Sequence, residues 1–102
     1  MNIYALSSGP GISGISVIRV SGPQTKRVIE KLSNGRFPKP RVATLKKINK
    51  INSKEVIDEG IIIWFPGPNS YTGEDMAEFH LHGSRAVILA VQASISQIEG
   101  CR

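Results

Sequence analysis

The strongest constraint on how this chain folds lies at residues 64–83, WFPGPNSYTGEDMAEFHLHG, where a rigid turn separates two apolar segments. Two prolines in the turn restrict φ, and Gly67 between them permits dihedral angles that other residues avoid. Asn69 and Ser70 follow, and their side chains can bond nearby backbone groups in a tight loop. The composition of this segment therefore predicts a tight turn between two strands.

The segment after the turn, residues 76–82, alternates between apolar and polar side chains. Successive side chains of a strand point to opposite faces, so this pattern predicts a strand with two different faces. One face carries Ala77, Phe79 and Leu81, and the other carries Met76, Glu78, His80 and His82.

Further strands and two helices can be predicted from periodicity and turn signals. We expect strands at residues 2–6, 15–20, 42–51 and 55–65, and helices from residues 21–23 to 34–35 and from 83–84 to 99–100. Asn52 and Ser53 mark a hairpin, and Pro23 suits the first turn of the first helix. The apolar run from Ile61 to Ile63 suits a strand that is covered on both faces. The order β-β-α-β-β-β-α predicts an α+β fold, a mixed or antiparallel sheet with two helices on one face.

Length and composition limit the classes of protein that fit. The chain has 102 residues, a size that suits one small domain and a modest stability that a partner subunit would increase. No apolar run approaches the length of a membrane span, and the N-terminus lacks a signal pattern, so we expect a cytoplasmic protein without membrane contact. Cys101 is a lone cysteine, which predicts an incidental terminal thiol without a disulfide.

The net charge of +5 is unevenly distributed. Between residues 26 and 54 there are ten lysines and arginines and a single acid, Glu30. Such a basic block can attract phosphate backbones, although a solvated surface has the same composition. A small basic RNA-binding or protein-interaction module is therefore the alternative interpretation of the chain, with Lys46 and Lys47 as its test residues.

The sequence contains no complete motif for nucleotide binding or nucleophilic catalysis. Residues 9–14, GPGISG, match the G-x-G-x-x-G pattern, but a β-branched strand follows where a dinucleotide site needs a helix. No P-loop pattern occurs, so we expect no nucleotide hydrolysis by that route. The hydroxyl residues Ser7, Ser8, Ser70 and Thr72 have no pattern that places a base beside them. We therefore predict no catalytic residue.

The polar side chains after the turn allow two interpretations. Glu78, His80 and His82 could supply a carboxylate and two imidazoles to a divalent metal, or they could line a pocket or a subunit interface, which we favour. Glu74, Asp75 and Glu78 repel one another unless they are solvated or paired. A cation, or a ligand edge rich in N–H donors such as a pterin or guanine ring, would relieve that repulsion.

Three segments carry a resemblance to a known family: FPGPNSYTGED followed by Glu78 and His82-Gly83, ISVIRVSGP at residues 15–23, and FPKPR at residues 37–41. In this order and spacing, residues 1–102 resemble the N-terminal domain of the tRNA-modification GTPase family MnmE, also called TrmE. The resemblance implies a fold like the folate-binding domain of aminomethyltransferases, a homodimer, and bound 5-formyltetrahydrofolate near the dimer interface. It assigns Arg19 and Glu78 to the folate contacts and implies neither a metal nor a nucleotide in this chain.

The resemblance also implies what full-length members contain in addition. They continue into a helical domain, a GTPase domain with a P-loop, and a cysteine motif that Cys101 does not match. With the helical and GTPase domains absent from these residues, we expect no complete catalytic activity from the chain alone. The full-length family acts with a flavin-dependent partner, GidA or MnmG, on the wobble uridine of tRNA, so tRNA processing is the implied context.

Overall fold

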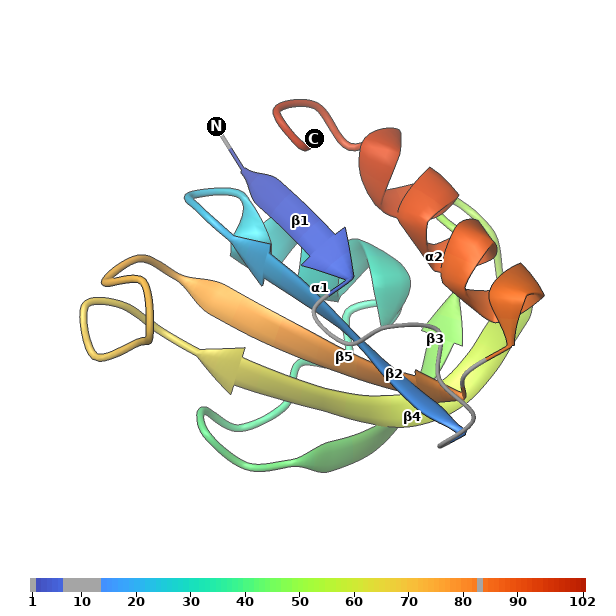
Figure 1. The fold of residues 1–102 in the computed structure, drawn as a ribbon, viewed down its shortest axis with the longest axis horizontal. Helices are drawn as coiled ribbons and strands as arrows, with labels where there is room; N and C mark the ends of the chain where they lie inside the picture. Colours follow the sequence, from blue (N-terminus) through green and yellow to red (C-terminus); the bar gives the residue numbers. More distant parts are fainter. Residues whose placement is uncertain (1, 7–13, 83) are drawn as a thin grey trace.

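The structure is a computed structural model that describes residues 2–6, 14–82 and 84–102. Within these residues the secondary-structure elements follow the predicted order (Figure 1). They are β1 (Ile3–Leu6), β2 (Ile15–Ser21), α1 (Thr25–Leu32), β3 (Thr44–Asn49), β4 (Val56–Phe65), β5 (Met76–His82) and α2 (Arg85–Ser96).

The strands form a five-stranded sheet in the order β1-β2-β5-β4-β3. Every neighbouring pair in this sheet is antiparallel, which confirms the predicted α+β class and resolves its sheet as antiparallel. The hairpin between β3 and β4 turns at Asn52, as predicted. The connection from β2 to β3 runs through α1 and crosses to the opposite edge of the sheet, so β2 pairs with β5 instead of β3.

One face of the sheet and both helices form the hydrophobic core. Ile18 of β2, Phe79 of β5 and Ile62 of β4 stand side by side in the strand register, and each has no exposed surface. The helices add Val28, Ile29, Leu32, Ile88, Val91 and Ile95 to the same core cluster. Their three- and four-residue spacing places these side chains on one face of each helix. The helices therefore share one face of the sheet, as predicted.

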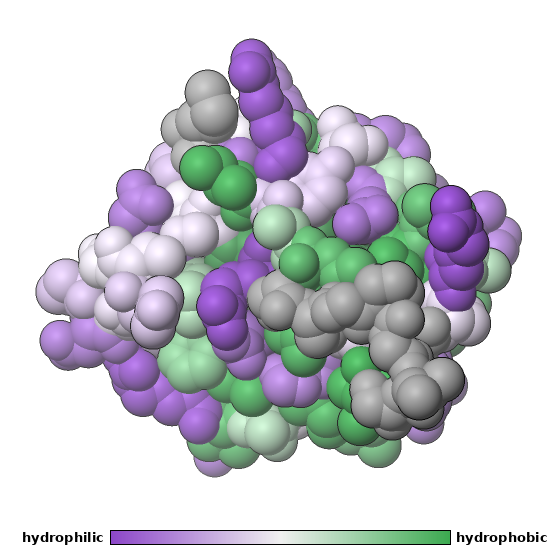
Figure 2. Space-filling view, in the orientation of Figure 1, coloured by the Kyte–Doolittle hydropathy of each residue, from purple (hydrophilic) through white to green (hydrophobic). Residues whose placement is uncertain are grey.

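No helix of the described chain covers the opposite face, which we call the open face. It carries the residues that alternate with the core positions, including Ile61 and Ile63, and both of these are only half-buried. The expectation that this strand is covered on both faces is therefore wrong within the chain, because the helices pack on one side only. Figure 2 shows apolar residues gathered over the strands, and Ile3, Ile15 and Leu45 are each more than half exposed.

The helix ends are defined by short local contacts. Pro23 precedes the N-cap Gln24 of α1, so it lies just before the helix and not in its first turn. At the other end, the Gly35 N–H donates to the Glu30 carbonyl at 2.8 Å, and Asn34, the residue before it, has a φ of +52°, as a Schellman ending requires. Ser84 caps α2, where its hydroxyl accepts the Val87 N–H at 3.1 Å. None of the described helices is long and apolar enough to cross a membrane.

Cys101 is part of the hydrophobic core and not an exposed residue at the end of the chain. Its side chain is buried in the core cluster, and the Asn2 amide donates to its sulfur at 3.6 Å. Backbone hydrogen bonds join this segment to the start of β1, from Asn2 to the Gly100 carbonyl and from Tyr4 to the Arg102 carbonyl. The prediction of an incidental thiol is therefore wrong, because the segment after α2 returns to the sheet edge beside β1.

Candidate functional site

Arg19 and Glu78 face each other on the open face. They are direct partners in the β2–β5 register, although 59 residues separate them in the sequence. The Arg19 guanidinium donates to one carboxylate oxygen, Oε2 of Glu78, from Nη2 at 2.7 Å and from Nε at 3.1 Å. The two residues that the family resemblance assigned to folate therefore form a single ion pair in the centre of the sheet.

His80 completes this cluster from the same strand as Glu78. Its Nε2 lies 3.0 Å from Oε1, the second carboxylate oxygen of Glu78. A carboxylate has about four acceptor positions, two on each oxygen. Arg19 occupies both positions on Oε2 and His80 one on Oε1. One position on Oε1 is left for a further donor.

The surroundings of Glu78 favour its charged form. Burial alone would raise its pKa, since the side chain is only 15% exposed. The hydrogen bonds from His80 and Arg19, together with the positive charge of Arg19, outweigh burial and lower the pKa of Glu78 below its usual value. The carboxylate is therefore an acceptor at neutral pH.

The lowered pKa of Glu78 predicts a stability that depends on pH. A carboxyl whose pKa is lower in the folded state stabilises the fold fully above its unfolded pKa of about 4.3, and this stabilisation is lost as pH falls through the folded value. We expect Glu78→Gln to lose less stability than the parent chain between about pH 6 and pH 3. Urea unfolding at several pH values measures this difference, and parallel curves for the two proteins would contradict it.

The loop between β4 and β5 reaches over the ion pair. The Tyr71 ring, which is 86% exposed, lies with its centroid 5.6 Å from Cζ of Arg19. The Thr72 hydroxyl is 2.8 Å from the hydroxyl of Ser21, and that of Ser21 donates to a Glu74 carboxylate oxygen at 3.4 Å. The turn is thereby tied to the end of β2, next to Arg19.

The three acids of the turn have separate partners within the chain. Asp75 accepts the Gly67 N–H at 2.9 Å and so closes the turn, whereas Glu74 is exposed beside Ser21. Glu78 is paired with Arg19. Pairing of Glu78 and Asp75 and the exposure of Glu74 thus relieve their mutual repulsion within the chain, so neither a cation nor a ligand is needed for that purpose.

A hollow of about 330 Å³ opens beside the ion pair on the open face. Most of its surface is apolar, although four of its six lining residues are polar or charged. The lining comes from β1, β2 and the loop before β5, and it consists of Ile3, Ala5, Arg19, Ser21, Thr72 and Glu74. Arg19 thus contacts the carboxylate on one side and a space for a small organic group on the other.

The two histidines of β5 point to different partners. His80 contacts Glu78, whereas His82 places Nδ1 2.8 Å from a carboxylate oxygen of Asp58 and donates its backbone N–H to the other oxygen at 2.9 Å. In the described part of the chain, no group of three or more histidine, cysteine, aspartate or glutamate side chains could hold a metal ion. Glu78, His80 and His82 share a face, as predicted, without converging on one point.

Two of the hydroxyl residues that we considered as nucleophiles, Ser70 and Thr72, form hydrogen bonds within the turn or to β2. Ser7 and Ser8, like residues 9–13 of the glycine-rich loop, lie outside the described residues. The Ser70 hydroxyl donates to the backbone carbonyl of Glu74, and Thr72 pairs with Ser21. These contacts hold the turn together and bring neither hydroxyl to a histidine.

The fold and the site define a small α+β domain whose antiparallel sheet carries helices on one face and a half-buried arginine–glutamate pair at the centre of the other. The family model described as GTP-binding protein TrmE N-terminus matches residues 2–102, and the chain belongs to this family. The predicted resemblance is therefore confirmed.

Individual relatives support the same family. The chain is 70% identical over 102 residues to a tRNA modification GTPase MnmE of Pelagibacter ubique, and 48% identical over 100 residues to a mitochondrial 5-taurinomethyluridine-[tRNA] synthase subunit GTPB3 of Danio rerio. These alignments cover 100% and 98% of the chain but only 23% and 20% of the two relatives. The chain thus spans between a fifth and a quarter of their length.

Sequence reasoning found part of this cluster and missed the rest. The alternation after the turn predicted that Glu78 and His80 share a face, and the resemblance singled out Arg19 and Glu78. The contact between Arg19 and Glu78, the position of Tyr71 over the guanidinium and the pairing of Asp58 with His82 were not predicted. All three depend on strand register and loop path, for which a single sequence gives no local signal.

Proposed function

We propose that this chain is the tetrahydrofolate-binding and homodimerising module of a cytoplasmic GTPase that modifies the wobble uridine of tRNA. The observation that carries the proposal is the Arg19–Glu78 pair beside an apolar hollow on the open face. The membership of the chain in the TrmE N-terminal family and the names of its relatives supply the tRNA context. Nucleotide hydrolysis, and work with a GidA or MnmG flavoprotein, belong in this proposal to the full-length protein.

The chemistry of both side chains suits 5-formyltetrahydrofolate. A charged carboxylate accepts hydrogen bonds from the ring N–H and the exocyclic amine of a pterin. Arg19 uses two of its five N–H donors on Glu78, and the remaining donors suit a carbonyl or carboxylate of the same ligand. The apolar walls of the hollow, Ile3 and Ala5, suit a flat ring system.

The hydrogen bonds that Glu78 already accepts limit how a pterin could bind to its carboxylate. Two donors from the ligand need two positions on the carboxylate, and one is left on Oε1. A second acceptor position becomes available if the ligand displaces His80 from Oε1. Oε1 is the less strongly held oxygen, because it accepts one hydrogen bond whereas Oε2 accepts two. His80 in this proposal holds the carboxylate in place until the ligand arrives.

The open face also supports the homodimer. Ile3, Ile15 and Leu45 are each more than half exposed on a sheet face that no described helix covers. Exposed apolar surface of this kind marks association sites when it is contiguous. Sedimentation measurements test the dimer, and we expect Leu45→Glu to shift the population toward monomer. A monomer at every concentration would contradict this part of the proposal.

Calorimetric titration with 5-formyltetrahydrofolate tests the folate site. We expect binding, and we expect Glu78→Gln to weaken it by roughly tenfold or more, because a neutral amide replaces a charged acceptor. Glu99→Gln is the matched control, since it makes the same change at an exposed position after α2 and should leave the affinity unchanged. A folded protein that binds no folate, or that binds it equally well with Glu78→Gln, would overturn the proposal.

A further inference from the structure

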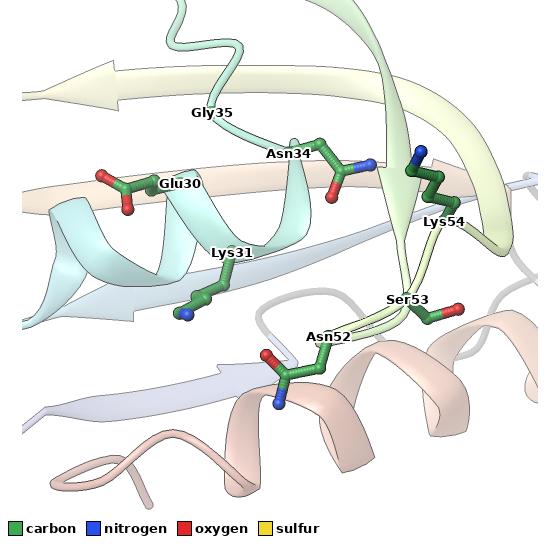
Figure 3. A pocket seen from close by; sticks show the side chains of 7 residues that line it. All are labelled: Glu30, Lys31, Asn34, Gly35, Asn52, Ser53 and Lys54. Carbon is green, nitrogen blue, oxygen red and sulfur yellow. The ribbon is translucent and has the colours of Figure 1, made fainter.

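A second concave region lies away from the Arg19–Glu78 pair, between the C-terminal end of α1 and the hairpin that joins β3 to β4. Two hollows of about 570 and 450 Å³ adjoin there and share Asn34 and Lys54 in their linings. Figure 3 shows the residues that line the larger of the two. We call them together the basic groove. They have no lining residue in common with the hollow beside Arg19.

Positive charge dominates the lining of the basic groove. It contains Lys31, Arg36, Lys47 and Lys54 and one acid, Glu30. Among the described residues, none of these four cations has an ion pair, whereas the neighbouring Lys50 is paired with Glu55 at 3.4 Å. The C-terminus of α1 contributes only about half a negative charge, and Lys31 lies in its last turn. The groove therefore has a clear excess of positive charge.

The two walls of the basic groove are held by hydrogen bonds of the chain itself. On the helix side, the Schellman ending at Gly35 fixes the turn that carries Asn34. On the hairpin side, the Asn49 amide donates to the Lys54 carbonyl at 3.2 Å, and the Lys50 N–H donates to the Glu55 carbonyl at 2.9 Å. The backbone positions of the groove are thus set before any ligand binds.

We propose that the basic groove binds the phosphodiester backbone of RNA. Lysine and arginine neutralise phosphates, and the amides of Asn34 and Asn52 and the hydroxyl of Ser53 can donate or accept at phosphate and ribose 2′-hydroxyl groups. In Figure 3, Asn34 and Lys54 extend toward the same space from the turn after α1 and from the hairpin. RNA is favoured over other polyanions because the relatives act in tRNA modification.

The composition of the basic groove argues against a membrane or a peptide as its partner. Its side chains are charged or polar apart from Val56. Binding to a lipid surface and binding to a peptide both rely on apolar side chains that become buried in the contact, and the groove lacks them. The groove and the folate site lie on different parts of the molecule, so each proposal can fail without the other.

The test compares two double variants that remove the same charge. Lys31→Gln with Lys54→Gln removes two cations of the groove, and Lys26→Gln with Arg85→Gln removes two exposed cations outside its lining. Binding of unfractionated tRNA is followed by fluorescence anisotropy between about 0.05 and 0.2 M salt. We expect the groove variant to bind about tenfold more weakly and to lower the slope of log affinity against log salt by roughly 1.5, since each lost phosphate contact removes about 0.7–0.9.

The control variant should lose less than about threefold in affinity. Equal losses in the two double variants, or an unchanged salt slope, would overturn the proposal. A variant of opposite sign, Glu30→Gln, removes the only acid of the groove and should tighten tRNA binding about two- to threefold, and it keeps the test open if the double variant fails to fold. Stronger binding to phosphatidylserine vesicles, to polyglutamate or to duplex DNA than to tRNA would also overturn the assignment to RNA. Folate titration of the same variants should be unchanged.

Discussion

Replacement of Phe79 with alanine is expected to lower the free energy of unfolding by about 3–5 kcal/mol, the usual cost of deleting a buried phenyl ring. Phe79 has no exposed surface and lies in the central strand β5, with Ile18 on one side and Ile62 on the other. β2 and β4 cannot move into the resulting space, because their hydrogen bonds to β5 hold both strands in place. For a domain with a typical total of about 5–15 kcal/mol, this loss is large.

Urea unfolding of both proteins measures the effect of Phe79→Ala, with equal m-values as the sign that the unfolded ensemble is unchanged. Phe37→Ala is the matched control, since Phe37 is 37% exposed and contacts the core through an edge-to-face arrangement with Trp64 at 5.6 Å. We expect it to cost about 1 kcal/mol. Similar losses at Phe79 and Phe37 would contradict the central place of Phe79 in the core.

The burial of Phe79 shows how far local sequence patterns reach. Alternation over residues 76–82 predicted both the strand and its apolar face, because period two is a property of each strand alone. The neighbours of that strand were not predictable in this way. β5 pairs with β2 and β4, and the order of strands depends on the path of α1 across the sheet, which only the packing of the whole core determines.

The ends of β3 show a second limit. Sequence periodicity predicted a strand over residues 42–51, whereas β3 covers Thr44–Asn49. At the start, a turn in which Arg41 has a φ of +64° and the Val42 N–H donates to the Lys39 carbonyl at 3.3 Å delays the strand, and at the end the register shifts between Ile48 and Asn49. Neither a left-handed arginine nor a bulge has a strong sequence signal, because both are imposed by neighbouring segments.

The site shows the same division between local and global information. The family motif selected Arg19 and Glu78, and alternation placed Glu78 with His80. Their direct contact arises from the β2–β5 register, in which Arg19 stands opposite Glu78. This contact also explains why the acids after the turn need no external cation: one is neutralised across the sheet, and Asp75 is used by the Gly67 N–H.

Arg19 provides the second large effect that we expect. Arg19→Ala should weaken binding of 5-formyltetrahydrofolate by roughly 100-fold, since hydrogen bonds to a charged group contribute about 1.5–3 kcal/mol and each 1.4 kcal/mol is a factor of ten. Arg19→Lys should lose about tenfold, because an ammonium keeps the charge but cannot hold Glu78 and a ligand with one planar fork. The Arg19 side chain is 38% exposed, so the ion pair itself should contribute less than about 1 kcal/mol to stability.

A double-mutant cycle separates the roles of the two residues in folate binding. If Arg19 acts partly by holding Glu78, the losses for Arg19→Ala and Glu78→Gln will not add, because residues in contact are energetically coupled. Calorimetry of the parent chain, both single variants and the double variant measures this coupling, with Lys26→Ala as the control for loss of one positive charge. Additive losses would mean that each residue contacts the ligand independently. If Lys26→Ala weakened folate binding as much as Arg19→Ala, net charge would determine the affinity, and not the Arg19 guanidinium that binds Glu78.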